Sequence, residues 1–471
     1  MAPRDWQDVH GAALWRYNLH YFDDLNAPDD DHARLPWQRA LIERWIAENP
    51  PAHGVGWDAY PTSLRIANWI RWLLRGNEPR PGMIESLAIQ ARWLRRRLEH
   101  HLLGNHLLVN CKALVFAGTF FAGAEAESWR AEGTTLLARE LDEQILADGG
   151  HFERSPMYHA LIFEDVLDLI ALDAIFPGTN SLDARLRAIA ARMQSWLDAM
   201  THPDGEIAMF NDSTRGVAAA PAALAGYARG LGIEPPWRRT SVTDLATSGY
   251  TRVECGDAVL FADTGEIGPS YTPAHGHADT LSFELSIDGR RIIVDSGVSE
   301  YGTSSERVRQ RGTAAHNTIA IDGADSSEVW SGFRVARRAH VAARAIEARV
   351  ACVTVRAEHD GYHRLTGRVT HARLWRVEDG ILVIEDDLKG AGWHRADVYF
   401  HFAPGLCPQP LRQSVWALGQ GLEIETDPAW GWTIESGTVH PAMGTVVDAS
   451  VLHGRIRGAL PLRLRTQIRW R

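Results

Sequence analysis

The sequence predicts an α+β protein of two parts, with helices in the first part and antiparallel strands in the second. Residues 37–231 place apolar residues at the three-to-four spacing of amphipathic helices. After about Pro235, apolar residues instead alternate with polar ones or form short β-branched runs, which is typical of strands. Helices first and strands second favour two domains over an alternating α/β fold. The predicted domains are 1–235 and 245–471.

The helical part divides into segments separated by residues that break helices. The clearest periodic segments are Thr62–Leu74, Ile84–Leu102, Thr134–Leu146 and Leu182–Met200. The breakers are Gly76-Asn77, Gly104-Asn105, Asp148-Gly149-Gly150 and Pro177-Gly178. Helix pairs joined by short loops, repeated several times, favour an all-α array.

The second part divides into short strands separated by glycine-containing turns. The predicted strands are Thr280–Ile287, Arg291–Asp295, Val350–Ala357, Leu365–Val377 and Ile381–Asp387. The turns Asp288-Gly289, Asp379-Gly380 and Gly390-Ala391-Gly392 are typical of hairpins. We therefore expect stacked antiparallel sheets.

The composition excludes several classes of protein. With 45% hydrophobic and 23% charged residues, the 471-residue chain is an ordinary globular protein. Its 49 basic and 59 acidic residues give a net charge of −10, so we expect no nucleic-acid partner, although a local cationic cleft is compatible with an acidic polymer. The four cysteines show no CxxC spacing, which indicates scattered thiols in a reducing compartment.

The sequence gives an expectation about location but none about oligomeric state. No apolar run reaches about 18 residues without a charge, so no membrane span is expected. Residues 1–25 are polar and acidic, and they show no secretory leader. We therefore expect a cytoplasmic protein, or a periplasmic or secreted one if a leader has been removed.

The densest polar signal is the segment from His275 to Asp279. His275 and His277 lie two residues apart on an extended chain, so they point to one face. Asp295 and His316 belong to neighbouring predicted strands, and together with His277 they offer ligands for a tetrahedral zinc. The alternative is a polar, hydrogen-bonded sheet edge, because 21 histidines make close pairs common.

Two segments of the helical part carry further candidates. Asn105 and His106 follow a glycine and offer an amide and an imidazole to a cleft. The alternative is that Asn105 caps a helix, and the known preferences for capping residues favour this alternative. Ser155 and Pro156 predict a helix start that puts Tyr158 in the first turn. There the helix dipole slightly favours a phenolate. Because the ordinary pKa of a tyrosine is about 10, Tyr158 can act as a base only with the help of a nearby cation such as Arg154 or a histidine. The alternative is a structural tyrosine.

Weaker candidates leave their alternatives open. Arg307, Arg309 and Arg311 are suited either to clamp a carboxylate or to decorate a solvated loop. The pair Asn211-Asp212 lines a cleft or caps the next segment. Trp69 and Trp72 are predicted to be core residues. The chain has no Walker loop and no GxGxxG, GxSxG or HExxH motif, so kinase, dinucleotide and serine-hydrolase functions lack support.

Taken together, these segments resemble the heparinase II/III-like polysaccharide lyases. The motifs that carry the resemblance are Gly104-Asn105-His106, Gly149-Gly150-His151-Phe152, Ser155-Pro156-Met157-Tyr158, His275-Gly276-His277-Ala278-Asp279, Asp295-Ser296-Gly297, and Arg311 through His316-Asn317-Thr318. The resemblance implies an incomplete α/α toroid followed by an antiparallel β-sandwich. It also implies β-elimination on a uronic-acid polysaccharide, which removes the C5 proton, expels the 4-O-linked sugar and leaves an unsaturated uronate end.

The resemblance implies roles for individual residues. Asn105 is similar to the amide that neutralises the substrate carboxylate, and Tyr158 to the tyrosine that protonates the leaving oxygen and also serves as base in a syn elimination. His275 is similar to the histidine that acts as base on the opposite face or orients the carboxylate. His106, Arg154 and Arg311 are predicted to bind substrate. The hypothesis requires Asn105, Tyr158 and His275 to meet around one sugar ring.

The resemblance also implies a metal and a class of substrate. His277, Asp295 and His316 are predicted to hold a divalent ion, zinc, in a structural role. The expected partner is an acidic polysaccharide or oligosaccharide, and the modest cationic charge favours a non-sulfated uronate polymer such as an exopolysaccharide or an alginate-like chain. Two alternatives remain: a non-catalytic protein of glycan binding or exopolysaccharide assembly, and a hydrolase whose metal activates water.

Overall fold

The computed structural model describes residues 6–7, 13–27, 33–179, 181–419 and 421–470. The chain forms two compact units that interleave along the sequence. Unit 1 comprises Met1–Gln144 and Asp165–Ala188, and unit 2 comprises Ile145–Glu164 and Ile189–Arg471.

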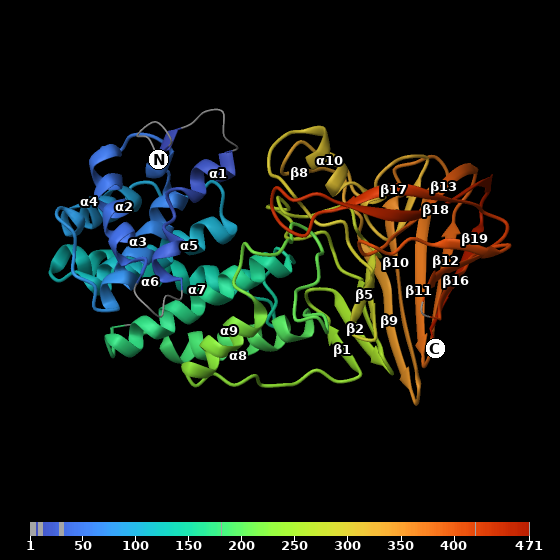
Figure 1. Cartoon of the computed structure of the whole chain (residues 1–471), viewed down its shortest axis with the longest axis horizontal. Helices are drawn as coiled ribbons and strands as arrows, with labels where there is room; N and C mark the ends of the chain where they lie inside the picture. The colour runs from blue at the N-terminus through green and yellow to red at the C-terminus, as the bar shows by residue number, and fades with distance from the viewer. Residues whose placement is uncertain (1–5, 8–12, 28–32, 180, 420, 471) are drawn as a thin grey trace. The chain divides into compact units, whose positions relative to one another are not determined.

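Within the described residues of unit 1, the regular elements are helices (Figure 1). Its helices are α1 (Ala13–Asn18), α2 (Leu35–Glu48), α3 (Ala59–Leu74), α4 (Met83–Arg95), α5 (Gly104–Phe120) and α6 (Ala124–Gln144), together with the later part of α7 (Pro156–Ile175) and the start of α8 (Asp183–Ala199). Helix α5 packs against α3 and α6 and buries every residue except His106 and Phe120. A helix that is apolar on nearly all sides belongs in the centre of a helical unit.

Tryptophan side chains fill the core of unit 1. Trp45 and Trp69 meet edge to face with ring centroids 5.5 Å apart, and the guanidinium of Arg65 lies 3.8 Å above the Trp45 ring. Trp69 and Trp72 are completely or almost completely buried, which confirms the prediction that they are core residues. Trp57 is also buried and therefore presents no open face to a ligand.

Unit 2 contains short helices and four antiparallel sheets. Its helices are the start of α7, the end of α8, α9 (Pro221–Gly230) and α10 (Ser305–Arg311). The five-stranded sheet runs β1 (Val242–Leu245), β2 (Tyr250–Cys255), β3 (Ala258–Asp263), β4 (Phe283–Ile287), β5 (Arg290–Ile293). The four-stranded sheet runs β17 (Gly431–Val439), β18 (Val447–Ala459), β13 (Trp393–His401), β6 (Ile319–Ile321).

The largest sheet has eight strands, and its long members stand side by side in Figure 1. Its order is β14 (Gln409–Arg412), β15 (Val415–Gly419), β16 (Leu422–Glu425), β19 (Leu462–Arg469), β12 (Ile381–Lys389), β11 (Val369–Glu378), β10 (Cys352–Tyr362), β9 (Val341–Arg349). The fourth sheet is a hairpin of β7 (Val329–Trp330) and β8 (Arg334–Val335).

Alternating burial packs these sheets into a sandwich. Along β11 every second residue is buried, so one face of the strand points into the protein and the other reaches the surface. Trp375 of β11 shares one hydrophobic core with Phe283 of β4 and Phe400 of β13. Helices followed by antiparallel sheets confirm the predicted fold class. Within the described part of the chain, no helix is both long and apolar enough to cross a membrane.

Two of the three predicted hairpins form, and the third prediction was wrong. Asp288 and Gly289 both have positive φ, as a type I′ turn requires, and they join β4 to β5. Asp379-Gly380 joins β11 to β12. Residues 390–392 instead carry the chain from β12 of the eight-stranded sheet to β13 of the four-stranded sheet. There the Ala391 N–H donates to the Gly367 carbonyl, so the turn is bonded to another loop. It does not join two strands that pair with each other.

Candidate active site

Tyr158 stands in the first turn of α7, within unit 2. The Ser155 hydroxyl accepts a hydrogen bond from the Tyr158 N–H at 3.2 Å and donates to the Asp212 carbonyl at 2.7 Å. This confirms Ser155 as the helix cap and ties the helix start to the segment containing Asp212. The Tyr158 ring lies 3.9 Å from the His275 ring between centroids, and its hydroxyl donates to the Tyr301 hydroxyl at 3.3 Å.

His275 is held from both of its ring nitrogens. Nδ1 lies 2.8 Å from Oδ2 of Asp212, and Nε2 lies 3.7 Å from Oε2 of Glu153. The Asp212 N–H also donates to the His275 carbonyl at 3.0 Å. The imidazole therefore has a defined orientation against the face of Tyr158.

Asp212 is the centre of this network. Arg307 donates to both carboxylate oxygens, and its bond to Oδ2 is 2.7 Å long. His277 Nε2 lies 2.8 Å from Oδ1. Asp212, His277 and Arg307 are all completely buried. The bidentate clamp predicted for an arginine does exist, but its target is the protein's own carboxylate. Arg309 instead pairs with Glu306 at the surface, as the solvated-loop alternative predicts.

The charge state of Asp212 assigns the hydrogens on the histidines. Burial alone would raise the pKa of Asp212, but the charge of Arg307 and the hydrogen bonds from His275 and His277 hold that pKa well below its usual value. An ionised carboxylate only accepts, so His275 donates through Nδ1 and His277 through Nε2. His275 Nε2 is then the atom that can receive a proton.

Tyr158 keeps its proton. Burial raises the pKa of Tyr158 well above 10, and the neighbouring Tyr301 and Asp212 raise it further. Burial outweighs the weak effect of the helix dipole, and Arg154, the cation suggested as a helper, donates to the Glu266 carbonyl. Tyr158 is thus built as a proton donor in the resting protein.

Asn105 and His106 belong to unit 1, at the start of α5. The helix begins at Gly104 with Leu103 in the cap position, so the alternative that Asn105 caps the helix is wrong. Leu103 has φ of 61°, a strained value for a side chain of its size, and such strain is often retained at functional sites. Asn105 is buried, whereas His106 is half-buried. Nδ1 of His106 lies 3.1 Å from Oε1 of Glu99, and its ring centroid lies 4.5 Å from that of Tyr60, with the two rings tilted.

Comparison with known families accounts for both parts of the chain. Residues 82–229 match the Heparinase II/III N-terminus family model, and residues 238–460 match the Heparinase II/III-like, C-terminal model. The chain belongs to the heparinase II/III-like family.

Curated members and relatives of this family match the chain at moderate identity. A Heparin-sulfate lyase of Bacteroides stercoris is 24% identical over 250 residues, which cover 48% of this chain and 37% of that protein. A Heparin-sulfate lyase of Bacteroides thetaiotaomicron is 27% identical, covering 68% and 53%. FtsZ-localized protein C of Caulobacter vibrioides is 28% identical, covering 82% and 67%. The chain thus spans less than two thirds of the length of either lyase.

Solved structures of heparinase II/III-like proteins share the fold. Heparinase III superposes with a TM-score of 0.74 at 19% identity, covering 93% of this chain and 73% of that one. The heparan sulfate lyase HepC of Pedobacter heparinus superposes with a TM-score of 0.67 at 19% identity, covering 96% and 76%. These neighbours support the predicted toroid-and-sandwich fold class.

The predicted metal ligands of this heparinase II/III-like chain lie near one another in unit 2. His316 Nδ1 is 2.7 Å from Oδ2 of Asp295, and the His277 and His316 rings are 5.3 Å apart. His277 Nδ1 and His316 Nε2 are buried and have no hydrogen-bond partner. Burial lowers the pKa of His277 to about 3, so its ring is neutral, as a ligand must be. Burial alone would lower the pKa of His316 too, but Asp295 raises it, so an ion at this site would have to displace a proton from His316. Across the described residues, no group of three side chains is arranged tightly enough to hold an ion as it stands.

Arg311 is completely buried and bonded to main-chain carbonyls. It donates to Gly276 O at 3.2 and 2.9 Å and to Ser331 O at 3.3 Å. Burial lowers its pKa to about 10. These bonds hold Gly276, the residue between His275 and His277, in place. The predicted contact of Arg311 with substrate stays a prediction.

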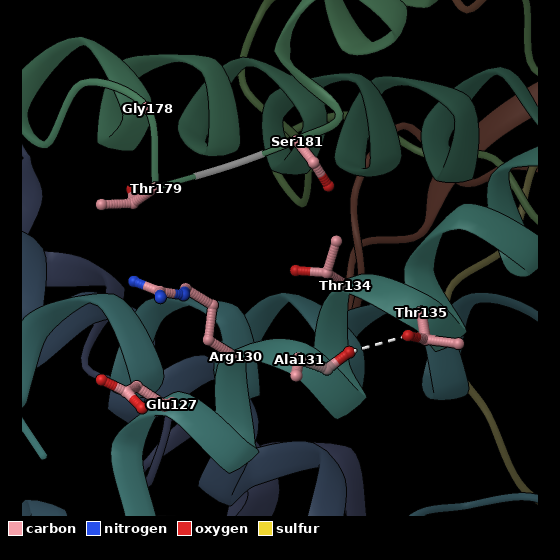
Figure 2. Close-up of a pocket in the computed structure, with 8 residues that line it drawn as sticks. All are labelled: Glu127, Arg130, Ala131, Thr134, Thr135, Gly178, Thr179 and Ser181. Carbon is pink, nitrogen blue, oxygen red and sulfur yellow. Dashed lines mark hydrogen bonds between the residues drawn. The ribbon is translucent and has the colours of Figure 1, made fainter. Parts of the chain in front are cut away.

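A surface hollow of about 490 Å³ lies in unit 1, and none of the predicted site residues lines it. Figure 2 shows Thr134 and Arg130 of α6 across from Thr179 and Ser181, and its one drawn bond joins the Thr135 hydroxyl to the Ala131 carbonyl. The two side chains of Glu127 and Arg130 are its only charged lining groups.

Sequence reasoning missed Glu153 and Tyr301 as site residues, and it offered Asp212 only as one of two alternatives, a cleft residue or a cap. A signal for Asp212 was available, because a carboxylate that follows the apolar Met209-Phe210 is costly to bury unless a cation pairs with it. The sequence offered Arg307 as a clamp for a carboxylate, but its partner, Asp212, lies 95 residues away in the chain. No local pattern joins the two.

Proposed function

We propose that the chain is a polysaccharide lyase that cleaves a uronic-acid polysaccharide by β-elimination. The observation that carries the proposal is the contact between Tyr158 and His275, whose rings lie 3.9 Å apart. One is a protonated phenol, and the other is an imidazole whose Nδ1 is occupied by Asp212. A proton donor and a proton acceptor side by side are what an elimination needs.

The proposed reaction moves one proton at each side. His275 Nε2 takes the C5 proton, and the C5–H electron pair forms the C4=C5 double bond. The C4–O bond breaks with its electrons on oxygen, and Tyr158 donates its hydroxyl proton to that oxygen. In the syn alternative Tyr158 performs both transfers, and loss of His275 then costs less than loss of Tyr158.

The amide of Asn105 is the proposed partner of the substrate carboxylate. Neutralising that carboxylate makes the C5 proton more acidic and stabilises the enolate-like charge that develops. The strained Leu103-Gly104 entry and the burial of Asn105 in the first turn of α5 support a specialised role. His106 is the proposed neighbouring substrate contact in unit 1.

The proposed substrate is an acidic polysaccharide without dense sulfation. Arg307, Arg311 and Arg154 of unit 2 all donate to acceptors within the protein, namely Asp212 or main-chain carbonyls. These three arginines therefore add little binding capacity for sulfate. Two relatives carry the name Heparin-sulfate lyase, so any test of substrates must also include sulfated polysaccharides.

We also propose a structural zinc held by His277, Asp295 and His316. Two buried imidazole nitrogens without partners, next to a carboxylate, are the donor types that zinc takes. The ion would hold together the three loop segments that carry these residues, and it would supply no step of the elimination.

The test is incubation with a panel of uronate polymers, sulfated and non-sulfated, followed by ultraviolet absorbance. Elimination creates a conjugated double bond and raises the absorbance as new reducing ends form. New reducing ends without absorbance would indicate the hydrolase alternative. Binding without new ends would indicate the non-catalytic glycan-binding alternative.

A further inference from the structure

The β7–β8 hairpin of unit 2 exposes two large aromatic side chains. Trp330 is 55% exposed and Phe333 is 40% exposed, on a two-stranded sheet with few residues of its own. Exposed aromatic side chains on so small an element gain little from packing. Such residues often mark a surface that meets a ligand.

The tip of this hairpin is fixed by the same arginines that organise the candidate active site. Arg307 Nε donates to the Gly332 carbonyl at 3.0 Å, and Arg311 donates to the Ser331 carbonyl. A Cβ on Gly332 would lie 2.1 Å from the Gly302 carbonyl oxygen, so the two backbones are in close contact. The tip is therefore held in place before any ligand arrives.

Phe333 extends the aromatic surface of the reacting pair. Its ring centroid lies 6.0 Å from that of His275 and 5.5 Å from that of Tyr301. The Tyr301 hydroxyl in turn meets the hydroxyl of Tyr158. The rings of Phe333 and Tyr301 lie edge to face, and we call this pair, which is joined to the proposed proton donor through the Tyr301 hydroxyl, the aromatic shelf.

We propose that the aromatic shelf is a sugar subsite that binds the pyranose leaving from the reacting uronate. This inference rests on the proposed function. The C–H face of a pyranose is apolar and packs on aromatic rings, whereas its hydroxyls remain in water. Tyr158 gives its proton to the oxygen of the departing sugar, so the ring bonded to that oxygen is the one beside Tyr301 and Phe333. The Arg307 guanidinium lies 5.0 Å from the Tyr301 ring centroid and 5.3 Å from that of Phe333, so a charge paired with Asp212 borders the shelf.

The experiment compares Phe333→Ala with Phe333→Trp and with Trp393→Ala. Trp393 is a 73% exposed aromatic residue on β13 and serves as the matched control. Phe333→Ala is expected to raise KM on the polymer about five- to tenfold, the size of one aromatic contact, with kcat changed less than twofold. Phe333→Trp should restore KM, and Trp393→Ala should leave both constants unchanged.

A binding measurement separates this inference from the proposed function. In the Tyr158→Phe background, titration calorimetry with the same polymer should show a matching loss of affinity on adding Phe333→Ala. If the wild-type protein cleaves no polymer, the elimination fails, yet a loss of binding would still support the shelf. If KM and Kd stay within twofold, or if only kcat falls, the shelf is overturned while the lyase proposal stands.

Discussion

Arg307 binds Asp212 through both carboxylate oxygens, although the two residues are 95 positions apart in the sequence. The same carboxylate fixes His275 on one oxygen and His277 on the other. Arg307 also donates to the tip of the β7–β8 hairpin. One buried ion pair therefore orients the proposed base, a proposed metal ligand and the aromatic shelf.

Asp212→Asn should impair both stability and catalysis. Removing one partner of a buried ion pair leaves the Arg307 charge uncompensated and typically costs about 3–5 kcal/mol in the free energy of unfolding. The amide also lets His275 adopt the other tautomer, so kcat should fall well before the protein unfolds. Urea unfolding and initial rates measure the two effects. Glu125→Gln, in the exposed pair with Arg92, is the control and should change neither.

Tyr158→Phe should lower kcat by about 10²–10⁴-fold, because a general acid is lost while the ring is kept. The ultraviolet assay measures the rate, and thermal melting checks the fold. Tyr362→Phe removes another buried phenol, which donates to the Ile319 carbonyl in the core of the sandwich. That control should cost about 1 kcal/mol of stability and leave the rate intact. Full activity in Tyr158→Phe would contradict the proposed role.

Asn105→Asp should be more damaging than Asn105→Ala. An amide donor facing developing charge is worth about 10²–10³ in kcat, and a carboxylate at that position would also repel the substrate carboxylate. The measurement is kcat/KM on the best polymer of the panel. Asn77→Ala, which removes an amide bonded to the Trp72 carbonyl elsewhere in unit 1, should behave as wild type. Equal activities for all three variants would remove Asn105 from the mechanism.

Chelation should lower thermal stability before it lowers activity, if the proposed zinc is structural. Elemental analysis of the purified protein should find zinc. The His316→Ala variant should contain no zinc, and chelator should no longer lower its Tm. Loss of activity at unchanged Tm, with restoration by added zinc, would instead favour the hydrolase alternative.

Stability should depend on pH through Asp397 and His453, which lie 2.9 Å apart on the four-stranded sheet. Burial alone would raise the pKa of Asp397, but His453 and Arg455 lower it to about 2, so its contribution is present above pH 3.8 and is lost as pH falls toward 2. Burial alone would lower the pKa of His453, but Asp397 and Glu435 raise it, so its contribution is complete below pH 6.5 and is lost as pH rises through the raised value.

Together these shifts predict that the pair stabilises the protein most between about pH 4 and 6.5. Thermal melting of wild type and Asp397→Asn across pH 2–9 measures this window. The difference in Tm between the two proteins should be greatest inside the window and shrink at both ends. A constant difference across the range would show that the pair does not titrate as described.

Local patterns in the sequence determined much of the architecture. Helix periodicity, strand alternation, the Asp288-Gly289 turn and the Ser155 cap depend on neighbours a few residues apart, and each appears in the structure. The motifs around Tyr158 and His275 also pointed to residues that prove to be in contact. Such features follow from backbone geometry and short-range hydrogen bonds, which a sequence displays directly.

Tertiary structure alone decided the partners and charge states. The sequence offered Arg307 as a clamp and Asp212 as a cleft residue, but only folding joined them. Burial, not the helix dipole, controls Tyr158, and the turn at 390–392 leads to a different sheet because its hydrogen bond goes to Gly367. Burial and ion pairing depend on segments far apart in the chain, and no local pattern encodes which segment will arrive.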